Sequence, residues 1–469
     1  MINWMNEVEK RSDALIKDTQ QLLHIKSLLD EENATEEAPL GEGVKNALMF
    51  MLNLGEKDGF ISKNVGNLAG HLEFGQGEEL LGILCHVDVV PEGDGWTSDP
   101  FGAEIRDGKI YARGALDDKG PTMAAYYAMK IVKELDLSLS KRVRMIIGTD
   151  EESNWRCVDH YFKHEEMPSI GFAPDADFPI IYAEKGISDF DIVYKIDAQK
   201  KSEKPLQILS FQSGRRYNMV PDFAKASLQI SDEQTKMIQE FDRYLENHQL
   251  KGKYYIENGV FFLEVEGVSA HGMEPKNGKN AGIYLANFLA NQELDELSTP
   301  FFEFISNYLF NDSRGDSLGI CFSDDITGDL TLNIGKLSFN QEVGGRLGVN
   351  LRYPVTNDMA KTKETLEKLL KKKGFLLENF SDSKPHHVDE KDVLIQTLKK
   401  VYEEQTGEKA ELISIGGGTY ARSLKSGVAF GPLFPGREDI AHQKDEYMYI
   451  EDLLKATAIY AQAIYELAK

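Results

Sequence analysis

Carboxylates and histidines stand at five points of the 469-residue sequence where an apolar segment ends or a helix pattern begins. The candidate residues are His86, Asp88, Asp117, Glu151, Glu152, Asp175 and His442. Two imidazoles among several carboxylates, without an ordered set of cysteines, form a ligand mixture that suits Zn²⁺, Mn²⁺ or Co²⁺. The composition does not choose among these metals, but it indicates a site for divalent cations.

His86 and Asp88 lie two residues apart at the end of a predicted strand, so their side chains project to the same side. Asp88 can then accept the second imidazole N–H and fix the tautomer of a metal-binding histidine. A core histidine capped by a loop aspartate is the alternative. These residues alone do not decide between the two.

Two adjacent acids, Asp117 and Asp118, open the helix pattern of residues 120–135. Asp118 is explained by the favourable interaction of an acid with a helix N-terminus. Asp117 is a candidate metal bridge, because a carboxylate can join two cations about 3.5–4 Å apart through its two oxygens.

Three consecutive acids, Asp150, Glu151 and Glu152, follow the predicted strand of residues 143–148, and Asp175 ends a further short strand. Like charges crowded at the end of a sheet repel one another unless a cation joins them. A solvated acidic loop is the alternative for the three consecutive acids.

The elements that position these residues alternate between strands and helices. Residues 80–91 form an apolar run typical of a fully buried strand, and helix patterns cover residues 120–135, 394–407 and 453–467. The first fifty residues add two further helices. This order predicts an α/β structure with helices on both faces of a mostly parallel sheet, in which ligands bind beyond the carboxyl ends of the strands.

The pattern changes at about residue 188, where alternating strands such as residues 260–268 and intervening helices predict an α+β domain. The α/β character resumes after residue 386. We therefore predict a catalytic domain in two parts, residues 1–187 and 385–469, interrupted by a lid domain of residues 188–384.

Charge and cysteine content limit the partners and the compartment. The chain has 53 basic and 77 acidic side chains and a formal net charge of −24, which argues against nucleic acid or an anionic membrane as a partner. Its three cysteines, Cys85, Cys157 and Cys321, have no paired spacing, and no signal-type or membrane-spanning apolar segment is present in the sequence. We expect a cytoplasmic location.

The motifs HVDVVP, RGALDDKG, GTDEESNW, PDA and SAH, followed by the late histidine, occur in an order that resembles one family. This is the dinuclear metallopeptidase family of aminoacylases, carboxypeptidases and desuccinylases. Within it, the segments GTDEESNW, GGGTYAR and NLRYP and the long central insert are most similar to bacterial dipeptidases of the peptidase V type. The resemblance spans essentially the whole chain.

The resemblance implies two divalent metal ions, with Zn²⁺ preferred over Mn²⁺ or Co²⁺. One ion is expected at His86, Asp117 and Asp175. The other is expected at Asp117, Glu152 and His442, so that Asp117 bridges the two.

The resemblance also implies the reaction, which is cleavage of unblocked dipeptides by a hydroxide held between the two metals. Glu151 matches the general base, and Asp88 is expected to support the metal-binding histidine. The peptide bond between Asp117 and Asp118 is expected to be cis.

The predicted lid contributes further residues by the same resemblance. His271 matches a histidine that stabilises the oxyanion, and Asn218 and Arg352 match positions that bind the substrate's terminal carboxylate. Outside the predicted lid, Gly416, Gly417 and Gly418 in the second part of the catalytic domain can donate backbone N–H groups to the same carboxylate, because glycines permit its close approach. Each of these residues also has a purely structural alternative. His271 would be a structural histidine, Asn218 part of a turn, Arg352 part of a surface salt bridge, and the three glycines an ordinary loop.

Two features depart from the family pattern. Cys85 stands where the family usually carries glycine, so its side chain must fit behind the ligand His86. The insert is about twice the usual length, from which we predict a catalytically complete monomer, with a dimer formed through the insert as the alternative.

Two other functions remain open at this point. An amidohydrolase acting on N-acyl amino acids shares the metal site and differs in what the lid binds. A non-catalytic peptide-binding protein is the second alternative, and it would not need the free base Glu151.

Overall fold

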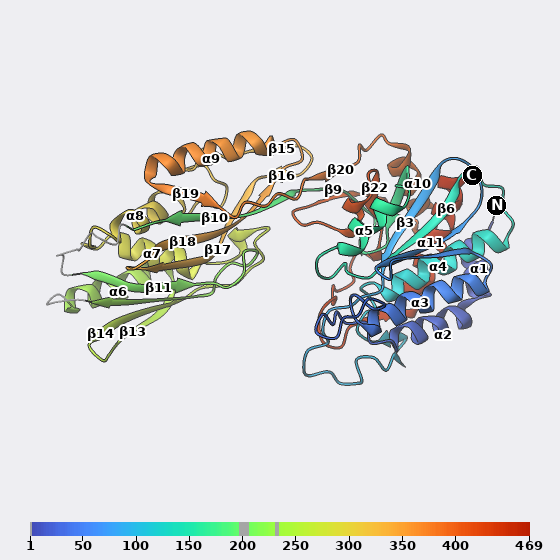
Figure 1. Cartoon of the computed structure of the whole chain (residues 1–469), viewed down its shortest axis with the longest axis horizontal. Helices are drawn as coiled ribbons and strands as arrows, with labels where there is room; N and C mark the ends of the chain where they lie inside the picture. Colours follow the sequence, from blue (N-terminus) through green and yellow to red (C-terminus); the bar gives the residue numbers. More distant parts are fainter. Residues whose placement is uncertain (1, 197–205, 230–233) are drawn as a thin grey trace. The chain divides into compact units, whose positions relative to one another are not determined.

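The computed structural model describes residues 2–196, 206–229 and 234–469. The chain divides into two compact units (Figure 1). Unit 1 comprises Met1–Ala183, His387–Ser414 and Thr419–Lys469, and unit 2 comprises Glu184–His386 and Ile415–Gly418. The predicted divisions at residues 187 and 385 lie beside these limits, but the glycines 416–418, which we predicted in the catalytic domain, group with unit 2.

A nine-stranded mixed sheet forms the framework of unit 1. Its strands are β1 (Ile61–Val65), β2 (Ala69–Phe74), β3 (Leu80–His86), β6 (Arg142–Gly148), β7 (Ile170–Ala173), β9 (Ile180–Glu184), β20 (His386–His387), β21 (Leu412–Ile415) and β22 (Gly427–Ala429). The order is β1-β2-β6-β3-β7-β22-β9-β20, with β21 paired to β9.

The centre of this sheet is parallel, because β6 pairs with β3, β3 with β7 and β7 with β22 in that sense. The flanking pairs β1 with β2, β2 with β6 and β22 with β9 are antiparallel. The prediction of a mostly parallel sheet therefore holds for the centre alone. A short turn joins β1 to β2, and such a turn permits only antiparallel pairing.

Helices cover both faces of this sheet, and β3 is buried along its whole length as a consequence. On one face α4 (Lys119–Glu134) and α11 (Ile450–Ala468) pack together and contact β3 and β6. Cys85 belongs to the core on that face. On the other face, Gly82 of β3 lies close to Leu424, the residue that follows the 3₁₀ helix η2 (Tyr420–Ser423). This arrangement confirms the predicted α/β class.

The remaining helices of unit 1 are α1 (Trp4–Glu9), α2 (Ser12–Leu23), α3 (Glu42–Lys57), α5 (Arg156–His164) and α10 (Val393–Thr406). The prediction of two helices in the first fifty residues is wrong, since α1, α2 and α3 all begin there and the chain turns between α1 and α2. The Arg11 guanidinium donates to the backbone carbonyl of Glu7 at 2.7 Å, and the Ser12 hydroxyl donates to that of Glu9 at 3.0 Å. These bonds satisfy carbonyls at the end of α1.

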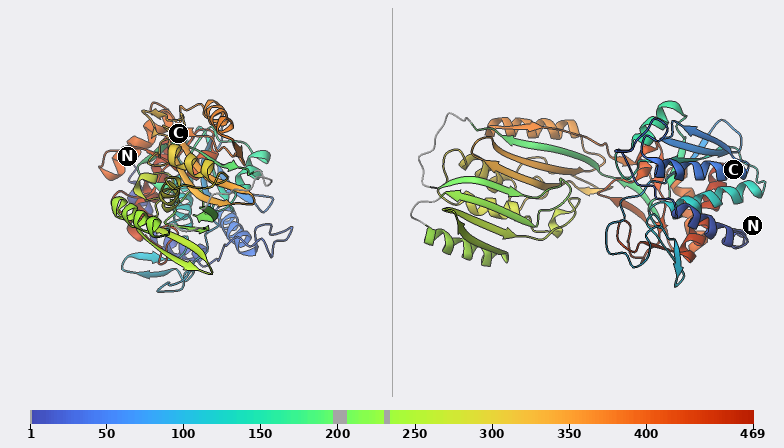
Figure 2. Two further views of the ribbon diagram at one scale, coloured as in Figure 1. Left: turned by 90° about the vertical axis from the view of Figure 1, so that its left-hand side faces the viewer. Right: turned by 60° about the horizontal axis from the view of Figure 1, so that its bottom comes forward.

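Unit 2 is an α+β structure built on one eight-stranded sheet of order β13-β14-β12-β11-β17-β18-β10-β19 (Figure 2). Its strands are β10 (Gly186–Tyr194), β11 (Gln207–Ser213), β12 (Phe223–Gln229), β13 (Lys251–Glu257), β14 (Val260–Glu266), β17 (Thr331–Asn340), β18 (Gly344–Tyr353) and β19 (Phe375–Glu378). Its helices are α6 (Gln234–His248), α7 (Ala281–Ala290), α8 (Thr299–Tyr308) and α9 (Met359–Lys373). Alternate strand residues and these helices bury one hydrophobic core that includes Phe211, Phe302 and Phe339.

Small sheets complete both units. Unit 1 has β4 (Glu104–Arg106), β5 (Lys109–Tyr111) and β24 (Tyr447–Tyr449) in one sheet and β8 (Ala176–Asp177) with β23 (Pro432–Leu433) in another. Unit 2 has the pair β15 (Ser323–Asp324) and β16 (Gly328–Asp329) and the 3₁₀ helix η1 (Pro275–Asn277).

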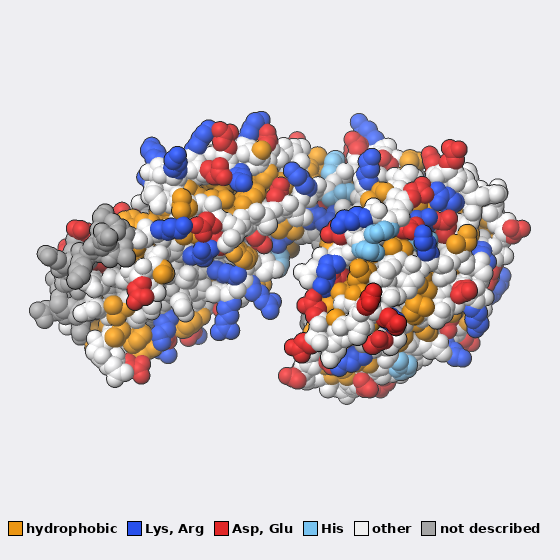
Figure 3. Space-filling model, in the orientation of Figure 1, with side chains coloured by type: hydrophobic (Ala, Val, Ile, Leu, Met, Phe, Trp, Pro, Cys, Tyr) orange, Lys and Arg blue, Asp and Glu red, His pale blue; other side chains and the backbone are white. Residues whose placement is uncertain are grey.

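Acidic and basic side chains are interspersed over both units on the face drawn in Figure 3. No helix in the described part of the chain combines the length and the apolar character that a membrane crossing requires.

Candidate metal centre

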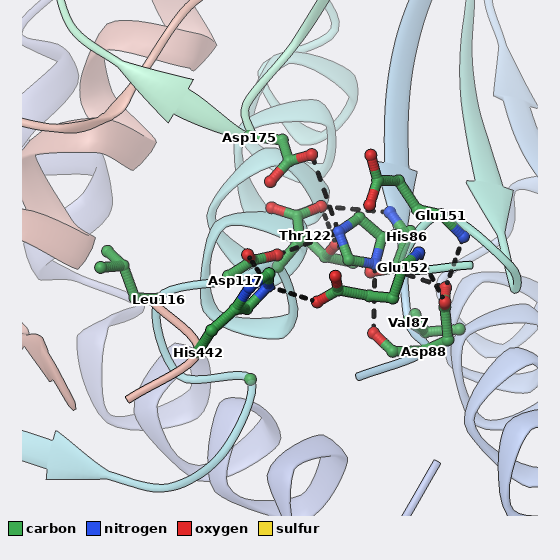
Figure 4. A network of polar contacts seen from close by, with 12 residues as sticks. His86, Val87, Asp88, Leu116, Asp117, Thr122, Glu151, Glu152, Asp175 and His442 are labelled. Atoms are coloured by element: carbon green, nitrogen blue, oxygen red, sulfur yellow. Dashed lines mark hydrogen bonds and ion pairs between the residues drawn. The ribbon is translucent and has the colours of Figure 1, made fainter. Parts of the chain in front are cut away.

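The candidate ligands of unit 1 meet at the carboxyl ends of its central parallel strands (Figure 4). His86 is the last residue of β3, Glu151 and Glu152 follow β6, and Asp175 follows β7. Because parallel strands end at the same edge, three segments far apart in the sequence deliver their polar side chains to one place. Asp117, from the loop before α4, and His442, from the loop before β24, complete the group.

Asp117 lies between the two histidines. Its Oδ1 is 3.1 Å from Nε2 of His86, and its Oδ2 is 3.0 Å from Nε2 of His442. Nε2 of His86 is also 3.7 Å from Oδ2 of Asp175, and Nε2 of His442 is 3.0 Å from Oε1 of Glu152. One carboxylate thus presents a different oxygen to each half of the site, as a bridging ligand must.

Two sets of three side chains have ligand atoms within 4.8 Å of one another. Asp117, Glu152 and His442 form one set, which is the composition expected for one metal. His86 and Asp175 form the other together with Glu151, whereas the resemblance assigns Asp117 to that place. Glu151 therefore lies close enough to His86 and Asp175 to act on a group bound between them.

Like charges are crowded in this centre. Burial, and then the charge of Asp117, raise the pKa of Glu152 to about 6, and the same two causes raise the pKa of Asp175 to about 6. Burial, followed by the charges of Asp175 and Asp117, also raises the pKa of Glu151.

The two histidines face these acids. Hydrogen bonds to Asp117 and Glu152 raise the pKa of His442 to about 11. Although burial opposes it, the charge of Asp175 and the bond to Asp117 hold the pKa of His86 above its ordinary value. Imidazoles and carboxylates that converge in a partly buried space form a donor set that fits divalent cations, because a cation relieves the repulsion among the acids.

Asp88 supports the centre differently from the prediction. The nearest acceptor to Nδ1 of His86 is the backbone carbonyl of Asp88 at 3.1 Å, and the carboxylate oxygen Oδ1 lies at 3.4 Å. The Asp88 carboxylate instead accepts the backbone N–H groups of Glu151 at 3.2 Å and Glu152 at 3.1 Å. Asp88 therefore holds the turn after β6, while its backbone orients His86.

Asp118 also has a role that the sequence interpretation missed. Asp118 stands at the N-cap of α4, where we expected an acid to interact favourably with the helix N-terminus, but its side chain makes no capping hydrogen bond there. Its Oδ2 accepts the backbone N–H of His86 at 3.1 Å and the hydroxyl of Thr122 at 3.0 Å, so it fixes the end of β3. The peptide bond between Asp117 and Asp118 is cis, as expected.

Three residues, one tyrosine and two cysteines, lie close behind the ligands. Cys85 is fully buried in the core, which answers how its side chain is accommodated, and burial raises the pKa of its thiol. The ring of Tyr420 packs edge-on against His86 with 5.9 Å between ring centroids, and its hydroxyl contacts Sγ of Cys157 at 3.2 Å. Tyr420 belongs to the GGGTYAR segment and is the first residue of the short η2.

The predicted lid residues form a second group, within unit 2. The N–H of Gly272, next to His271, donates to the carbonyl of Asn218 at 2.7 Å. Arg352, which is 5% exposed, donates from Nη1 to the carbonyl of Gly416 at 3.3 Å. Burial, and then the charge of Arg352, lower the pKa of His271.

The other two glycines of the run, Gly417 and Gly418, adjoin Gly416 in unit 2. The structure thus brings the predicted lid residues together around Arg352 and His271. It places the metal-ligand candidates together in unit 1.

Comparisons with known proteins agree with this arrangement. Residues 82–466 match the model of peptidase family M20/M25/M40. The chain is 56% identical over 468 residues to the Bacillus subtilis (strain 168) protein named "Putative dipeptidase YtjP", covering 100% of both chains. It is 47% identical over 464 residues to a Staphylococcus epidermidis protein named "Putative dipeptidase", covering 99% of each.

Solved structures share the fold. The aminoacylhistidine dipeptidase of Vibrio alginolyticus superposes with a TM-score of 0.59 at 12% identity, with 97% of each chain covered. Human carnosine dipeptidase 1 superposes with a TM-score of 0.55 at 14% identity, with 99% of this chain and 98% of that chain covered. The family match over most of the sequence and the close full-length relatives establish that this chain belongs to peptidase family M20/M25/M40.

Proposed function

We propose that the protein is a metal-dependent dipeptidase that hydrolyses the peptide bond of unblocked dipeptides. The observation that carries the proposal is the partly buried centre of unit 1, in which Asp117 presents one carboxylate oxygen to His86 and the other to His442. The full-length relatives named as dipeptidases support the substrate class.

The centre would hold two divalent cations. His86, Asp117 and Asp175 would bind one of them, and Asp117, Glu152 and His442 would bind the other. When bound, the cations supply a lowered pKa for water and polarisation of the peptide carbonyl. Zn²⁺ is our first assignment because mixed imidazole and carboxylate sites suit it, and Mn²⁺ and Co²⁺ are the alternatives.

Glu151 would act as the general base. Its carboxylate lies within 4.8 Å of the ligand atoms of His86 and Asp175, and its raised pKa suits a group that takes a proton from the attacking water and then passes it to the leaving amine. Asp88 would keep Glu151 in place through the backbone hydrogen bond described above.

The cluster of unit 2 would recognise the substrate. The guanidinium of Arg352 is suited to a terminal carboxylate, to which Asn218 and the N–H groups of Gly416, Gly417 and Gly418 would also bind. His271 would donate to the carbonyl oxygen as negative charge develops there. Its lowered pKa leaves it neutral, with one ring N–H available as a donor.

We propose a cytoplasmic location for this activity, with small peptides as the partners. The support is that Cys85, Cys157 and Cys321 are all free thiols in the structure, as expected in a reducing compartment.

A substrate panel tests the proposal. Holoenzyme is assayed with free dipeptides, a tripeptide, N-acetyl amino acids and N-acetylated dipeptides, and products are separated by chromatography. We expect cleavage of free dipeptides and little turnover of the acylated compounds. Turnover of the N-acetyl amino acids alone would contradict the dipeptidase assignment and favour an N-acyl amidohydrolase.

A further inference from the structure

A buried glutamate outside the two ligand sets contacts the loop that carries Asp117. Glu446 is fully buried, and its Oε2 accepts from Nη1 of Arg113 at 2.5 Å and from the N–H of Gly114 at 3.2 Å. Its Oε1 accepts from the N–H of Leu116 at 2.8 Å and from that of Asp117 at 3.2 Å. Four donors from one short loop therefore converge on one carboxylate.

The backbone of Glu446 is bound to the same loop. Its carbonyl accepts the N–H of Ala112 at 3.0 Å, and the chain then continues as β24, which pairs with β5 in antiparallel sense. The preceding residue, Asp445, accepts from the N–H and hydroxyl of Thr97 at 2.8 and 2.9 Å. These bonds anchor the end of the loop that carries His442.

The two segments joined in this way supply two ligands of one cation set. Asp117 and Glu446 are 329 residues apart in the sequence, and His442 lies four residues before Glu446. His442 has a φ of 64°, a left-handed conformation that residues other than glycine adopt uncommonly, so its loop needs support from its surroundings. Its Nε2 nevertheless lies 3.0 Å from Oδ2 of Asp117.

We propose that Glu446 is a positioning residue for the cation site formed by Asp117, Glu152 and His442. It holds the Asp117 loop and the His442 loop in register, so that both side chains reach the same ion. This inference rests on the proposed function, because it concerns one of the two cations assigned there. Arg113, which is 1% exposed, balances the charge of the glutamate and leaves its two oxygens to order the loop.

The reach of the carboxylate and its charge can be separated by two substitutions. Glu446→Gln keeps the reach but turns an amide N–H₂ toward backbone donors. Glu446→Asp keeps the charge but is one methylene too short to bond Arg113 and Leu116 at once. If position is what matters, both variants should weaken the same cation site.

The experiment titrates the metal-free full-length protein with Co²⁺ and follows the visible absorption of the bound ion together with equilibrium dialysis. Wild-type protein should bind two ions. In both Glu446 variants we expect the ion held by Asp117, Glu152 and His442 to bind about 10–100-fold more weakly, as is typical for residues that orient metal ligands. The other ion shares only Asp117 with this site and should be weakened less.

Glu73→Gln is the matched control. Glu73 is a buried glutamate on β2 that accepts from Nε of Arg144 at 2.6 Å and contacts none of the candidate ligands in the described structure. Its substitution removes a buried arginine pair from the same unit and should leave both Co²⁺ affinities unchanged. Urea unfolding of each metal-free variant checks that the comparison is made on folded protein.

Wild-type affinity for both ions in Glu446→Asp would overturn the proposal, since charge alone would then suffice. An equal loss in Glu73→Gln would also overturn it, because general destabilisation would explain the result. If Glu446→Gln does not fold, the aspartate variant decides. Failure of Co²⁺-loaded wild-type protein to cleave dipeptides would refute the proposed function separately, since Co²⁺ binding is measured without substrate.

Discussion

At the scale of single residues, neighbouring acids in the centre have separate tasks set by their surroundings. Asp88 and Asp118 are almost fully buried. Asp88 uses both carboxylate oxygens, and Asp118 uses its Oδ2, to accept hydrogen bonds from backbone and hydroxyl donors of the protein. Asp117 and Glu152 face the histidines. Carboxylates that accept hydrogen bonds from the protein's own donors fix the positions of the neighbouring loops. Carboxylates that face the imidazoles are available to bind a cation.

Glu151→Gln tests the general base. Since this substitution removes the proton acceptor and keeps the side-chain shape, we expect kcat for a dipeptide to fall by about 10²–10⁴-fold. Two metal ions per chain should remain bound, as measured by elemental analysis. The exposed acid Glu36 provides the control, and Glu36→Gln should keep full activity.

The outcome for metal content also decides a structural question. Loss of one ion in Glu151→Gln would show that Glu151 is a ligand with His86 and Asp175. Unchanged kcat would contradict its role as base.

The sequence predicted which residues come together in the centre, because strand ends and acidic motifs are visible without a structure. It did not reveal Glu446 or Tyr420. Glu446 lies four residues after a candidate ligand and reads as a surface acid, since its burial depends on a loop more than three hundred residues earlier. Tyr420 reads as part of a glycine-rich segment, and only packing places its ring against His86.

At the scale of elements, the end of β6 is tightly packed against the segment that follows the glycine run. A Cβ atom at Gly148 would lie 1.9 Å from the hydroxyl oxygen of Tyr420 and 3.2 Å from Sγ of Cys157. Position 148, immediately before the acids of the centre, therefore has no room even for a methyl side chain unless Tyr420 moves.

We predict that Gly148→Ala lowers the free energy of unfolding by about 1–3 kcal/mol, because the methyl group overpacks a closely filled site. Activity should fall as well, since Tyr420 must move away from His86. Urea unfolding followed by circular dichroism measures the stability. An unchanged unfolding midpoint would show that Tyr420 is free to shift.

The interface of β2, β6 and α5 contains a neutral histidine. The ring nitrogen Nδ1 of His71 lies 2.8 Å from the hydroxyl of Tyr161, and the side chain is buried near Arg144. Burial, and then the charge of Arg144, lower the pKa of His71 to about 4.

The expected effect is a loss of stability in acid. Because the unfolded chain binds a proton at about pH 6.5 and the folded chain only near pH 4, stability is complete above pH 6.5 and falls as the pH drops toward 4. Over this range His71 alone should lower the free energy of unfolding by about 3 kcal/mol. Urea unfolding across this range should show a shallower decline for His71→Gln, while the exposed His24→Gln should decline like wild type.

The sequence predicted the starts of the central strands β3 and β6 and of the helices α4, α10 and α11 to within a few residues, since buried strands and amphipathic helices have clear periodicity. It missed β1 and the break between α1 and α2. Strand β1 is largely exposed and mixes polar with apolar residues, so it carries no alternating pattern. The helix break depends on side-chain bonds from Arg11 and Ser12, which periodicity does not report.

At the scale of the whole molecule, the edges of the unit 2 sheet bear on the oligomeric state. The edge strand β13 is mostly exposed and carries Lys251 and Lys253, and the other edge strand, β19, has only four residues. Charged or short edge strands disfavour pairing between sheets of different molecules. Unit 2 also has one continuous sheet around one core.

We therefore predict a monomer of 52.8 kDa that is active by itself. Sedimentation velocity of the holoenzyme at assay concentrations measures this directly. Specific activity should be independent of protein concentration. A stable dimer whose dissociation abolishes activity would contradict the prediction.

The central claim is that two divalent cations in the unit 1 centre drive dipeptide hydrolysis. The most direct measurement is to remove all metal, restore Zn²⁺, Mn²⁺ or Co²⁺ stepwise, and record the ions bound per chain together with the rate of hydrolysis of a free dipeptide. Our account predicts no hydrolysis by the metal-free protein and full activity only when two ions are bound. Undiminished hydrolysis by the metal-free protein, or none at any metal loading, would contradict it.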